Sequence, residues 1–274
     1  MVNDGSVHAT SAPGSARPLV IAHRGARSLA PENTLAAARK AIEAGADMWE
    51  LDAAVTADGE LVVVHDDTLE RTSNAAQVYP QRRPWQVWDL TLAEIQALDF
   101  GSWYQEQDPF GQIDAGNVSA EDLASYAGER APTLRQALEL TRDRGWRVNV
   151  ELKEQPTDEL GRVLVAKTVA LAQELGLVTG NRLAISSFNH SYLRAVRRAD
   201  PRIAIQALTS EAIDDLPAYL AGLGTRACNP MAGAWSPSEL RGLAERGVLW
   251  NVWTVNDEEE MEQLVAAGVQ GIIT

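Results

Sequence analysis

The stretch MWELDAAVTADGELVVVHDD, residues 48–67, consists of two apolar runs on either side of Asp58 and Gly59. An Asp-Gly pair between apolar runs predicts a tight β-hairpin, because both central residues of such a turn must tolerate positive φ. If these two residues form the whole loop, Asp52 lies opposite His65. Directly opposed side chains have Cβ atoms about 4.5–5.5 Å apart. The hairpin is therefore predicted to hold an imidazole beside a carboxylate.

Two acidic side chains share one face of the first hairpin strand. Side chains alternate along a strand, so Glu50 and Asp52 point to one side, while Trp49 and Leu51 point to the other. Carboxylates on an inward face repel each other and lose hydration, so a cation or basic side chains must neutralise them. The alternative interpretation is a buried ion-pair network with no catalytic role.

Short apolar runs alternate with helical patterns over most of the chain. Eight strand–helix units in about 250 residues are typical of a (β/α)₈ TIM barrel. The second hairpin arm, antiparallel, would extend the second strand without joining the barrel. The predicted strands begin near residues 18, 48, 147, 182, 202, 225, 248 and 270. The predicted helices are 31–44, with Pro31 in its first turn and Gly45 as its C-cap, then 133–144, 158–175, 190–199, 213–223, 237–246 and 258–267.

Residues 66–131 do not fit the repeat, so we expect a barrel domain at 18–274 with a small inserted subdomain at about 66–131. Thr91 and Glu94 have the spacing of a helix capping box. An insertion at this position lies over the active face of a barrel, whereas a plain surface insertion is the alternative. Its large aromatic residues are expected to form a lid: Trp85, Trp88, Phe100, Trp103 and Tyr104.

Composition excludes several classes of function. The 274 residues carry a formal net charge of -14, which disfavours nucleic acid or an anionic membrane as the main partner. The single Cys228 excludes an intrachain disulfide and a cysteine-based metal site. No apolar run reaches the roughly 18 residues of a membrane span. Residues 1–17 are predicted to be a flexible tail without a signal-peptide pattern, which favours a cytoplasmic location, while a leader removed beforehand leaves secretion open.

The inward face of a barrel is expected to be apolar in the middle and functional at the carboxyl ends of its strands. Asn149, Glu151 and Lys153 share one face of the third strand, and the apolar residues between them share the other. Glu151 and Lys153 should then lie at the mouth beside Glu50 and Asp52. Oxygen ligands without cysteine or a histidine pair suit Mg²⁺, Ca²⁺ or Mn²⁺ better than Zn²⁺.

Two of the histidines end strands at the same mouth. His23 and His65 are candidates for acid and base roles, because the ordinary pKa of histidine lies near neutrality. Trp253, at the end of the seventh strand, is expected to form a wall of the pocket, with a plain core position as the alternative. His190 is interpreted as a residue at a helix start without a functional role.

Taken together, these residues resemble the glycerophosphodiester phosphodiesterase family from about residue 18 to the end. Any one motif is short, but the ordered set is specific. It comprises His23-Arg24-Gly25, Pro31-Glu32-Asn33-Thr34, Glu50-Leu51-Asp52, His65-Asp66-Asp67-Thr68-Leu69-Glu70-Arg71-Thr72, Pro132-Thr133-Leu134, Glu151-Leu152-Lys153, Ser186-Ser187-Phe188, Trp253-Thr254-Val255-Asn256 and Gly271-Ile272-Ile273-Thr274.

The resemblance implies a TIM barrel that hydrolyses small-molecule glycerophosphodiesters to glycerol 3-phosphate and an alcohol. It implies one divalent metal ion, Mg²⁺ or Ca²⁺ with Mn²⁺ as a third candidate. By motif position the roles would be metal ligands for Glu50, Asp52 and Glu151, catalytic acid and base for His23 and His65, phosphate binding for Arg24 and Lys153, and packing on the alcohol moiety for Trp253. The role of Glu32 stays open.

Two other functions compete with this interpretation. A phospholipase-type phosphodiesterase would share the barrel and the metal but needs an apolar rim that faces a membrane. A non-catalytic barrel that binds phosphodiesters needs no pair of histidines. The resemblance also implies an Asp-x-Pro turn after the last strand, whereas the sequence stops at Thr274, so we expect a truncated or incompletely ordered end there. The length of residues 105–130 leaves the substrate size open.

Overall fold

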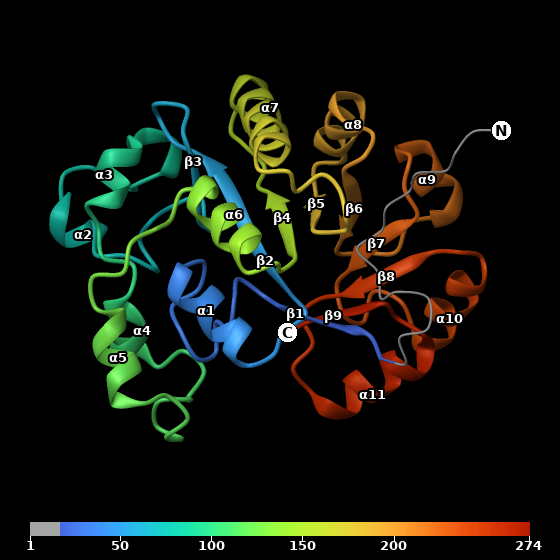
Figure 1. The fold of residues 1–274 in the computed structure, drawn as a ribbon, viewed down its shortest axis with the longest axis horizontal. Coiled ribbons are helices and arrows are strands. Elements are labelled where there is room, and N and C mark those ends of the chain that lie inside the picture. The colour runs from blue at the N-terminus through green and yellow to red at the C-terminus, as the bar shows by residue number, and fades with distance from the viewer. Residues whose placement is uncertain (1–16) are drawn as a thin grey trace.

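The alternating apolar runs form a closed barrel of eight parallel strands in the computed structural model, which describes residues 17–274 (Figure 1). Pairing between the first and second strands closes the barrel. The predicted TIM barrel is confirmed. Around the barrel the strands follow the order β1 (Leu19–Ala22), β9 (Gly271–Ile273), β8 (Leu249–Val252), β7 (Ala227–Pro230), β6 (Ala204–Thr209), β5 (Leu183–Ser187), β4 (Val148–Leu152) and β2 (Met48–Val55).

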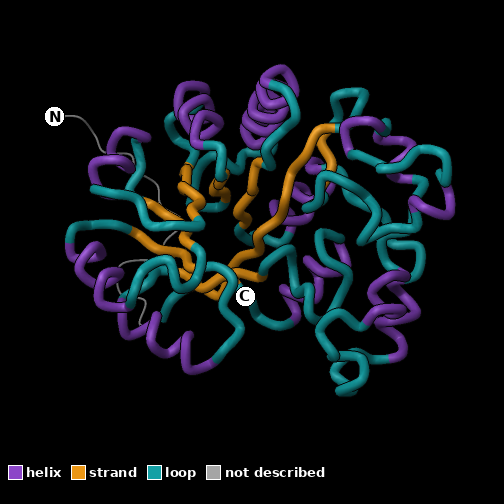
Figure 2. The backbone as a smooth tube through the Cα atoms, turned by 180° about the vertical axis from the view of Figure 1, so that it is seen from behind, coloured by secondary structure: helices purple, strands orange, loops and turns teal. Residues whose placement is uncertain are grey.

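Helices surround these strands, as Figure 2 shows from behind. The helices pack on the outward faces of the strands. On β2 this face carries the buried residues that alternate with Glu50 and Asp52. Trp49 stacks on Trp146 with ring centroids 6.0 Å apart and donates a 2.9 Å hydrogen bond to Oγ1 of Thr141. The barrel helices are α1 (Leu35–Glu43), α6 (Leu134–Asp143), α7 (Asp158–Glu174), α8 (His190–Ala199), α9 (Leu216–Leu223), α10 (Pro237–Glu245) and α11 (Glu258–Ala267).

Helix α1 begins later than the sequence predicts. Its N-cap is Thr34, whose side chain accepts a hydrogen bond from the backbone of Ala37, so Pro31 precedes the helix and is not in its first turn. The physical reason is Asn33, which has a φ of 58° and therefore cannot continue a right-handed helix. Gly45, with a φ of 81°, follows the C-cap residue and ends the helix.

The predicted hairpin forms, but its register differs by one residue. Its loop has three residues, because Thr56 pairs with Glu60 and only Gly59 within the loop takes a positive φ, 76°. The prediction that Asp52 lies opposite His65 is therefore wrong, and His65 lies beyond the end of the strand. The short antiparallel strand β3 (Leu61–Val63) pairs Leu61 with Val55, Val62 with Ala54 and Val63 with Ala53.

Between β3 and α6 the chain forms short helices at one side of the barrel, on the left of Figure 1. The predicted capping box is confirmed, since Thr91 and Glu94 exchange side-chain and backbone hydrogen bonds. The segment contains α2 (Ala75–Val78), a 3-10 helix (Val87–Asp89), α3 (Leu92–Gln96), α4 (Ser102–Gln107) and α5 (Ala120–Tyr126).

Most of the large aromatic residues in this segment are core residues. Trp85 and Phe100 pack with Leu69 and other apolar side chains into one cluster. Trp103 and Tyr104 belong to a second cluster, which includes residues of the loop after β1. These four aromatic side chains are therefore buried anchors that give a small segment its own core.

The predicted N-terminal tail lies outside the described residues except for Arg17, which forms a 2.6 Å ion pair with Asp47. Among the helices of residues 17–274, none is both long and apolar enough to cross a lipid bilayer.

Replacing Gly101 by Ala should destabilise the protein by about 2–3 kcal/mol. A Cβ at this position would overlap the backbone carbonyl of Tyr126, although the φ of -110° would suit any residue. Gly222→Ala is the matched control, since nothing lies within 4 Å of its Cβ position in α9. We expect that substitution to stabilise the protein by roughly 0.5–1 kcal/mol. Urea unfolding at unchanged slope measures both effects, and equal midpoints for the two variants would contradict this account.

Candidate active site

A cavity of about 140 Å³ lies at the carboxyl ends of the barrel strands. Parallel strands bring these ends together, so residues that are distant in sequence meet there. Of the eight site residues proposed from the sequence, seven line the cavity, and Asp52 lies beside it with only 1% of its surface exposed. The lining comprises His23, Arg24, Glu50, His65, Asn149, Glu151, Lys153, Ser186, Phe188, Leu208, Trp253 and Ile273.

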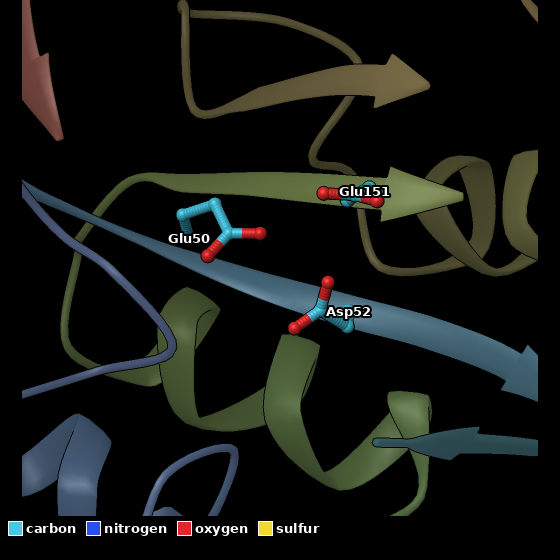
Figure 3. Close-up of side chains that lie close together, drawn as sticks. All are labelled: Glu50, Asp52 and Glu151. Atoms are coloured by element: carbon cyan, nitrogen blue, oxygen red, sulfur yellow. The ribbon is translucent and has the colours of Figure 1, made fainter. Parts of the chain in front are cut away.

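Three acidic side chains converge at one point of this site, which we call the acid triad: Glu50, Asp52 and Glu151. Asp52 is the neighbour of Glu151 in the register of β2 and β4, and one oxygen of each of the three carboxylates lies within 4.8 Å of the others (Figure 3). Buried Oε1 of Glu50 and Oδ1 of Asp52 lack a hydrogen-bond partner within the described chain. Unpartnered buried carboxylate oxygens fit a hard divalent cation.

The charges of the acid triad are only partly compensated. Burial, followed by the charges of Asp52 and Glu151, raises the pKa of Glu50 well above its ordinary value. Burial would also raise the pKa of Asp52, but Lys153 and Arg24 outweigh it and lower that pKa to about 2. The ammonium of Lys153 lies 2.9 Å from Glu151 and 3.7 Å from Asp52. Glu50 is thus the member whose ionised form most needs another cation.

His23 follows β1 and is held between two polar groups. Its Nδ1 lies 3.1 Å from Oγ1 of Thr254, and its Nε2 lies 3.9 Å from Oε2 of Glu50. Burial, then the positive charges of Arg27 and Arg24, lowers the pKa of His23 to about 2. The ring is therefore neutral near neutral pH.

His65 reaches the cavity from the bend after β3 and is held by a network that the sequence analysis did not assign. Its Nδ1 lies 2.6 Å from Oδ1 of Asp66, which in turn accepts hydrogen bonds from Arg71. Arg71 also donates two hydrogen bonds to Glu32, and Glu32 accepts another from Arg24. We call this series the His65 network. The two sequence motifs that contain Glu32 and His65 include most residues of this network, but the spacing of these residues along the chain does not predict their contacts.

Asn33 is a second residue that sequence reasoning missed. Its side chain donates a 2.8 Å hydrogen bond to Oδ2 of Asp52 and accepts one of 3.2 Å from the backbone of Asp52. The positive φ of Asn33 directs the loop after β1 toward β2. Asn33 therefore fixes the orientation of one member of the acid triad, which gives the Pro31 to Thr34 motif a structural reason.

The barrel interior below the mouth is polar, contrary to expectation. Asn149 donates to Ser186 over 2.9 Å, Asn229 donates to Gln206 over 2.8 Å, and Asn251 donates to Asn229 over 3.2 Å. These pairs give partners to the buried amide nitrogens, whereas Oδ1 of Asn149 and Oδ1 of Asn251 have no hydrogen-bond partner within the described residues. An apolar layer lies lower, at strand starts such as Leu19, Met48 and Ala204.

The sequence matches the model of the glycerophosphoryl diester phosphodiesterase family over residues 23–274. It is 36% identical over 259 residues to a glycerophosphodiester phosphodiesterase of Caldanaerobacter subterraneus subsp. tengcongensis, a match that covers 94% of each chain. It is 30% identical over 271 residues to a glycerophosphodiester phosphodiesterase of Bacillus subtilis, which covers 94% of this chain and 83% of that protein.

Solved structures give the same result. A putative glycerophosphoryl diester phosphodiesterase from Silicibacter pomeroyi superposes with a TM-score of 0.81 at 26% identity, covering 99% of this chain and 93% of the other. A phosphodiesterase from Oleispira antarctica, in complex with the product sn-glycerol-3-phosphate, superposes with a TM-score of 0.77 at 27% identity, covering 94% and 93%.

Because the charges of the acid triad are unequally compensated, replacing Glu50 or Asp52 by its uncharged amide should change the stability of the protein in opposite directions. Because the raised pKa of Glu50 means that folding disfavours its charge, Glu50→Gln should stabilise chelator-treated protein at pH 8 by about 1–2 kcal/mol. Asp52→Asn should destabilise it by a similar amount, because Arg24 and Lys153 would lose an anion. Thermal unfolding in chelator measures both, with shifts of roughly 2–8 °C.

Acidification supplies the control for this prediction. The gain of Glu50→Gln should shrink once the pH falls below the raised pKa of Glu50 and vanish only below the ordinary pKa of a glutamate, where the side chain is neutral in the unfolded wild type as well. The loss of Asp52→Asn should persist until the pH approaches the lowered pKa of Asp52. Parallel shifts of the two variants at pH 8 would contradict the charge distribution described here.

Proposed function

The chain belongs to the glycerophosphoryl diester phosphodiesterase family, and from this premise we propose that it hydrolyses glycerophosphodiesters to glycerol 3-phosphate and an alcohol. The observation that carries the proposal is one cavity lined by His23, His65, Arg24, Lys153 and carboxylates of the acid triad. The product complex of the Oleispira antarctica protein supports a small-molecule substrate.

The acid triad would hold one divalent metal ion, Mg²⁺ or Ca²⁺, with Mn²⁺ as the third candidate. When bound, the ion supplies Lewis-acid stabilisation of the charge on phosphoryl oxygens. Arg24 and Lys153 would bind the non-bridging oxygens of the diester, where cationic donors stabilise the charge that develops in the transition state. Both side chains already line the cavity, with carboxylates holding them in place.

His23 and His65 would transfer the protons of the reaction. One accepts the proton of the attacking oxygen, and the other donates a proton to the alkoxide that leaves when its bond to phosphorus breaks. Direct attack by water and prior attack by a neighbouring substrate hydroxyl both need this pair. Asp66 and Thr254 would act as positioning residues, because each fixes Nδ1 of one ring and leaves Nε2 for the substrate.

Trp253 would pack on an alcohol moiety of the diester from the wall of the cavity. We propose that residues 18–274 act as one catalytic barrel domain and that residues 66–131 are a subdomain inserted into it. The position of this segment beside the active cavity supports a role in substrate choice, since Trp88 from it lines an adjoining cavity.

Metal dependence can be tested by turnover after chelation. Chelator-treated protein should release less than a hundredth of the glycerol 3-phosphate released by enzyme with added Mg²⁺, Ca²⁺ or Mn²⁺, because the charge on phosphoryl oxygens would lose its main stabilisation, about 3 kcal/mol. Glycerophosphoethanolamine is a suitable substrate. Undiminished turnover in chelator would refute the metal role. No turnover with any ion, from protein with intact tryptophan fluorescence, would refute hydrolysis and favour the binding barrel.

Substitution of His23 or His65 should lower kcat, whereas substitution of a histidine outside the cavity should not. His23→Ala and His65→Ala should each lower kcat by about 10²–10⁴. Asp66→Asn should lower it less, by roughly tenfold, because it misorients the ring of His65 without removing it. His190 is the matched control, since it bonds Tyr219 and the carbonyl of Leu208 instead of lining the cavity. His190→Gln should retain kcat, and a His65→Ala variant that keeps more than about a tenth of wild-type kcat would exclude the acid–base role.

A further inference from the structure

A second cavity, of about 660 Å³, adjoins the active cavity. The two share Glu151, Lys153 and Phe188 as lining residues. The second cavity is the larger, so a substrate whose phosphate lies in the active cavity can extend into it past these shared side chains. Its own walls include Asp67, Gln86, Trp88 and Glu154.

The segment after His65 and the segment around Trp88 are fixed against each other. The backbone of Val87 donates a 2.9 Å hydrogen bond to the carbonyl of Asp67, and Thr68 pairs with Gln86 in an antiparallel bridge. Asp67, which lies two residues beyond the candidate catalytic His65, and Trp88 are therefore held on the same wall of the second cavity. This side of the second cavity thus begins beside His65, one of the two candidate proton-transferring residues.

Two aromatic side chains bound the second cavity. Phe188 is 43% exposed, although it is a large apolar residue, and its ring meets Trp253 edge to face with centroids 5.6 Å apart. Trp88 faces the cavity from the segment after β3 and is half-buried. Aromatic faces attract cations through the ring quadrupole, and quaternary ammonium groups are recognised in this way.

The second cavity also has an excess of negative charge. Asp67 and Glu154 are exposed and form no ion pair within residues 17–274; the side-chain contact of Glu154 is a 3.4 Å hydrogen bond from Asn189. The one basic residue of the lining, Lys153, has its ammonium against Glu151 and Asp52. Two carboxylates without a cationic partner, beside two aromatic rings, fit an organic cation better than an uncharged polyol or an anion.

Resting on the proposed function, we propose that the second cavity binds the head group of the leaving alcohol and selects a cationic amine, either quaternary ammonium as in choline or primary ammonium as in ethanolamine. The glycerol phosphate half stays in the active cavity. Asp67 and Glu154 neutralise the head group, and Trp88 and Phe188 contact its alkyl groups. These are specificity residues that take no part in bond cleavage.

The test compares four diesters with metal-loaded enzyme: glycerophosphocholine, glycerophosphoethanolamine, glycerophosphoglycerol and glycerophosphoinositol. The wild type should show kcat/KM about tenfold higher for the first two. Asp67→Asn and Glu154→Gln should each lower kcat/KM for these two substrates by roughly three- to tenfold and leave glycerophosphoglycerol unchanged. Glu106→Gln, which removes an exposed charge of α4 outside both cavities, is the matched control and should change none of the four values.

Equal losses of kcat/KM on diesters with cationic and with uncharged head groups would overturn the assignment of the second cavity. Equal kcat/KM for all four diesters in the wild type would do the same, while the hydrolase proposal stands. A second measurement is independent of turnover: calorimetric binding of choline in the presence of sn-glycerol 3-phosphate. Choline should bind wild-type protein and bind Trp88→Leu at least about threefold more weakly. Absence of choline binding would refute the subsite, whereas choline binding without turnover of any diester would refute only the hydrolase proposal.

Discussion

Mutual repulsion among buried carboxylates is the constraint on which the rest of the structure depends. Parallel pairing of β2 and β4 forces Asp52 beside Glu151, and the period of a strand adds Glu50 to the same face. Ionised carboxylates at such distances are unstable together unless cations surround them. Arg24 and Lys153 supply part of that charge, and the remaining deficit lies at Glu50. A cation bound at the acid triad would therefore raise the free energy of unfolding, because it would offset this repulsion in the folded state.

The charges around the acid triad also connect distant parts of the chain. Glu32, in the loop after β1, accepts hydrogen bonds from both Arg24 and Arg71, and Arg71 holds Asp66 against His65. Each arginine thus pairs with two acids, Arg24 with Glu32 and Asp52, and Arg71 with Glu32 and Asp66. The Arg24–Glu32 pair is largely shielded from water, with side-chain exposures of 12% and 5%, whereas the side chain of Arg71 is 41% exposed. Catalytic orientation would consequently depend on a network that spans two loops.

The fold and most of the site could be predicted from the sequence, because strand and helix periods depend on local patterns of apolar residues. The boundaries of α8 and α11 came out as predicted for that reason. The hairpin register did not, because an Asp-Gly pair fits a loop of two or of three residues, and one residue decides which side chains face each other. The amide pairs inside the barrel, such as Asn149 with Ser186, and the contacts of Asn33 depend on tertiary neighbours that no local pattern encodes.

Residues 66–131 carry side chains that belong both to the proposed proton transfer and to the proposed choice of substrate. Asp66 and Arg71, which hold His65, lie at the very start of this segment. Trp88 and the buried aromatic residues Trp85 and Phe100 lie further along the same segment. The later part of the segment also contacts the residues that hold His65, since the backbone of Val87 donates a 2.9 Å hydrogen bond to the carbonyl of Asp67 and the guanidinium of Arg71 lies 5.9 Å from the ring centroid of Trp103. A change of head-group preference through Trp88 would therefore have to preserve the contacts that fix the loop after His65.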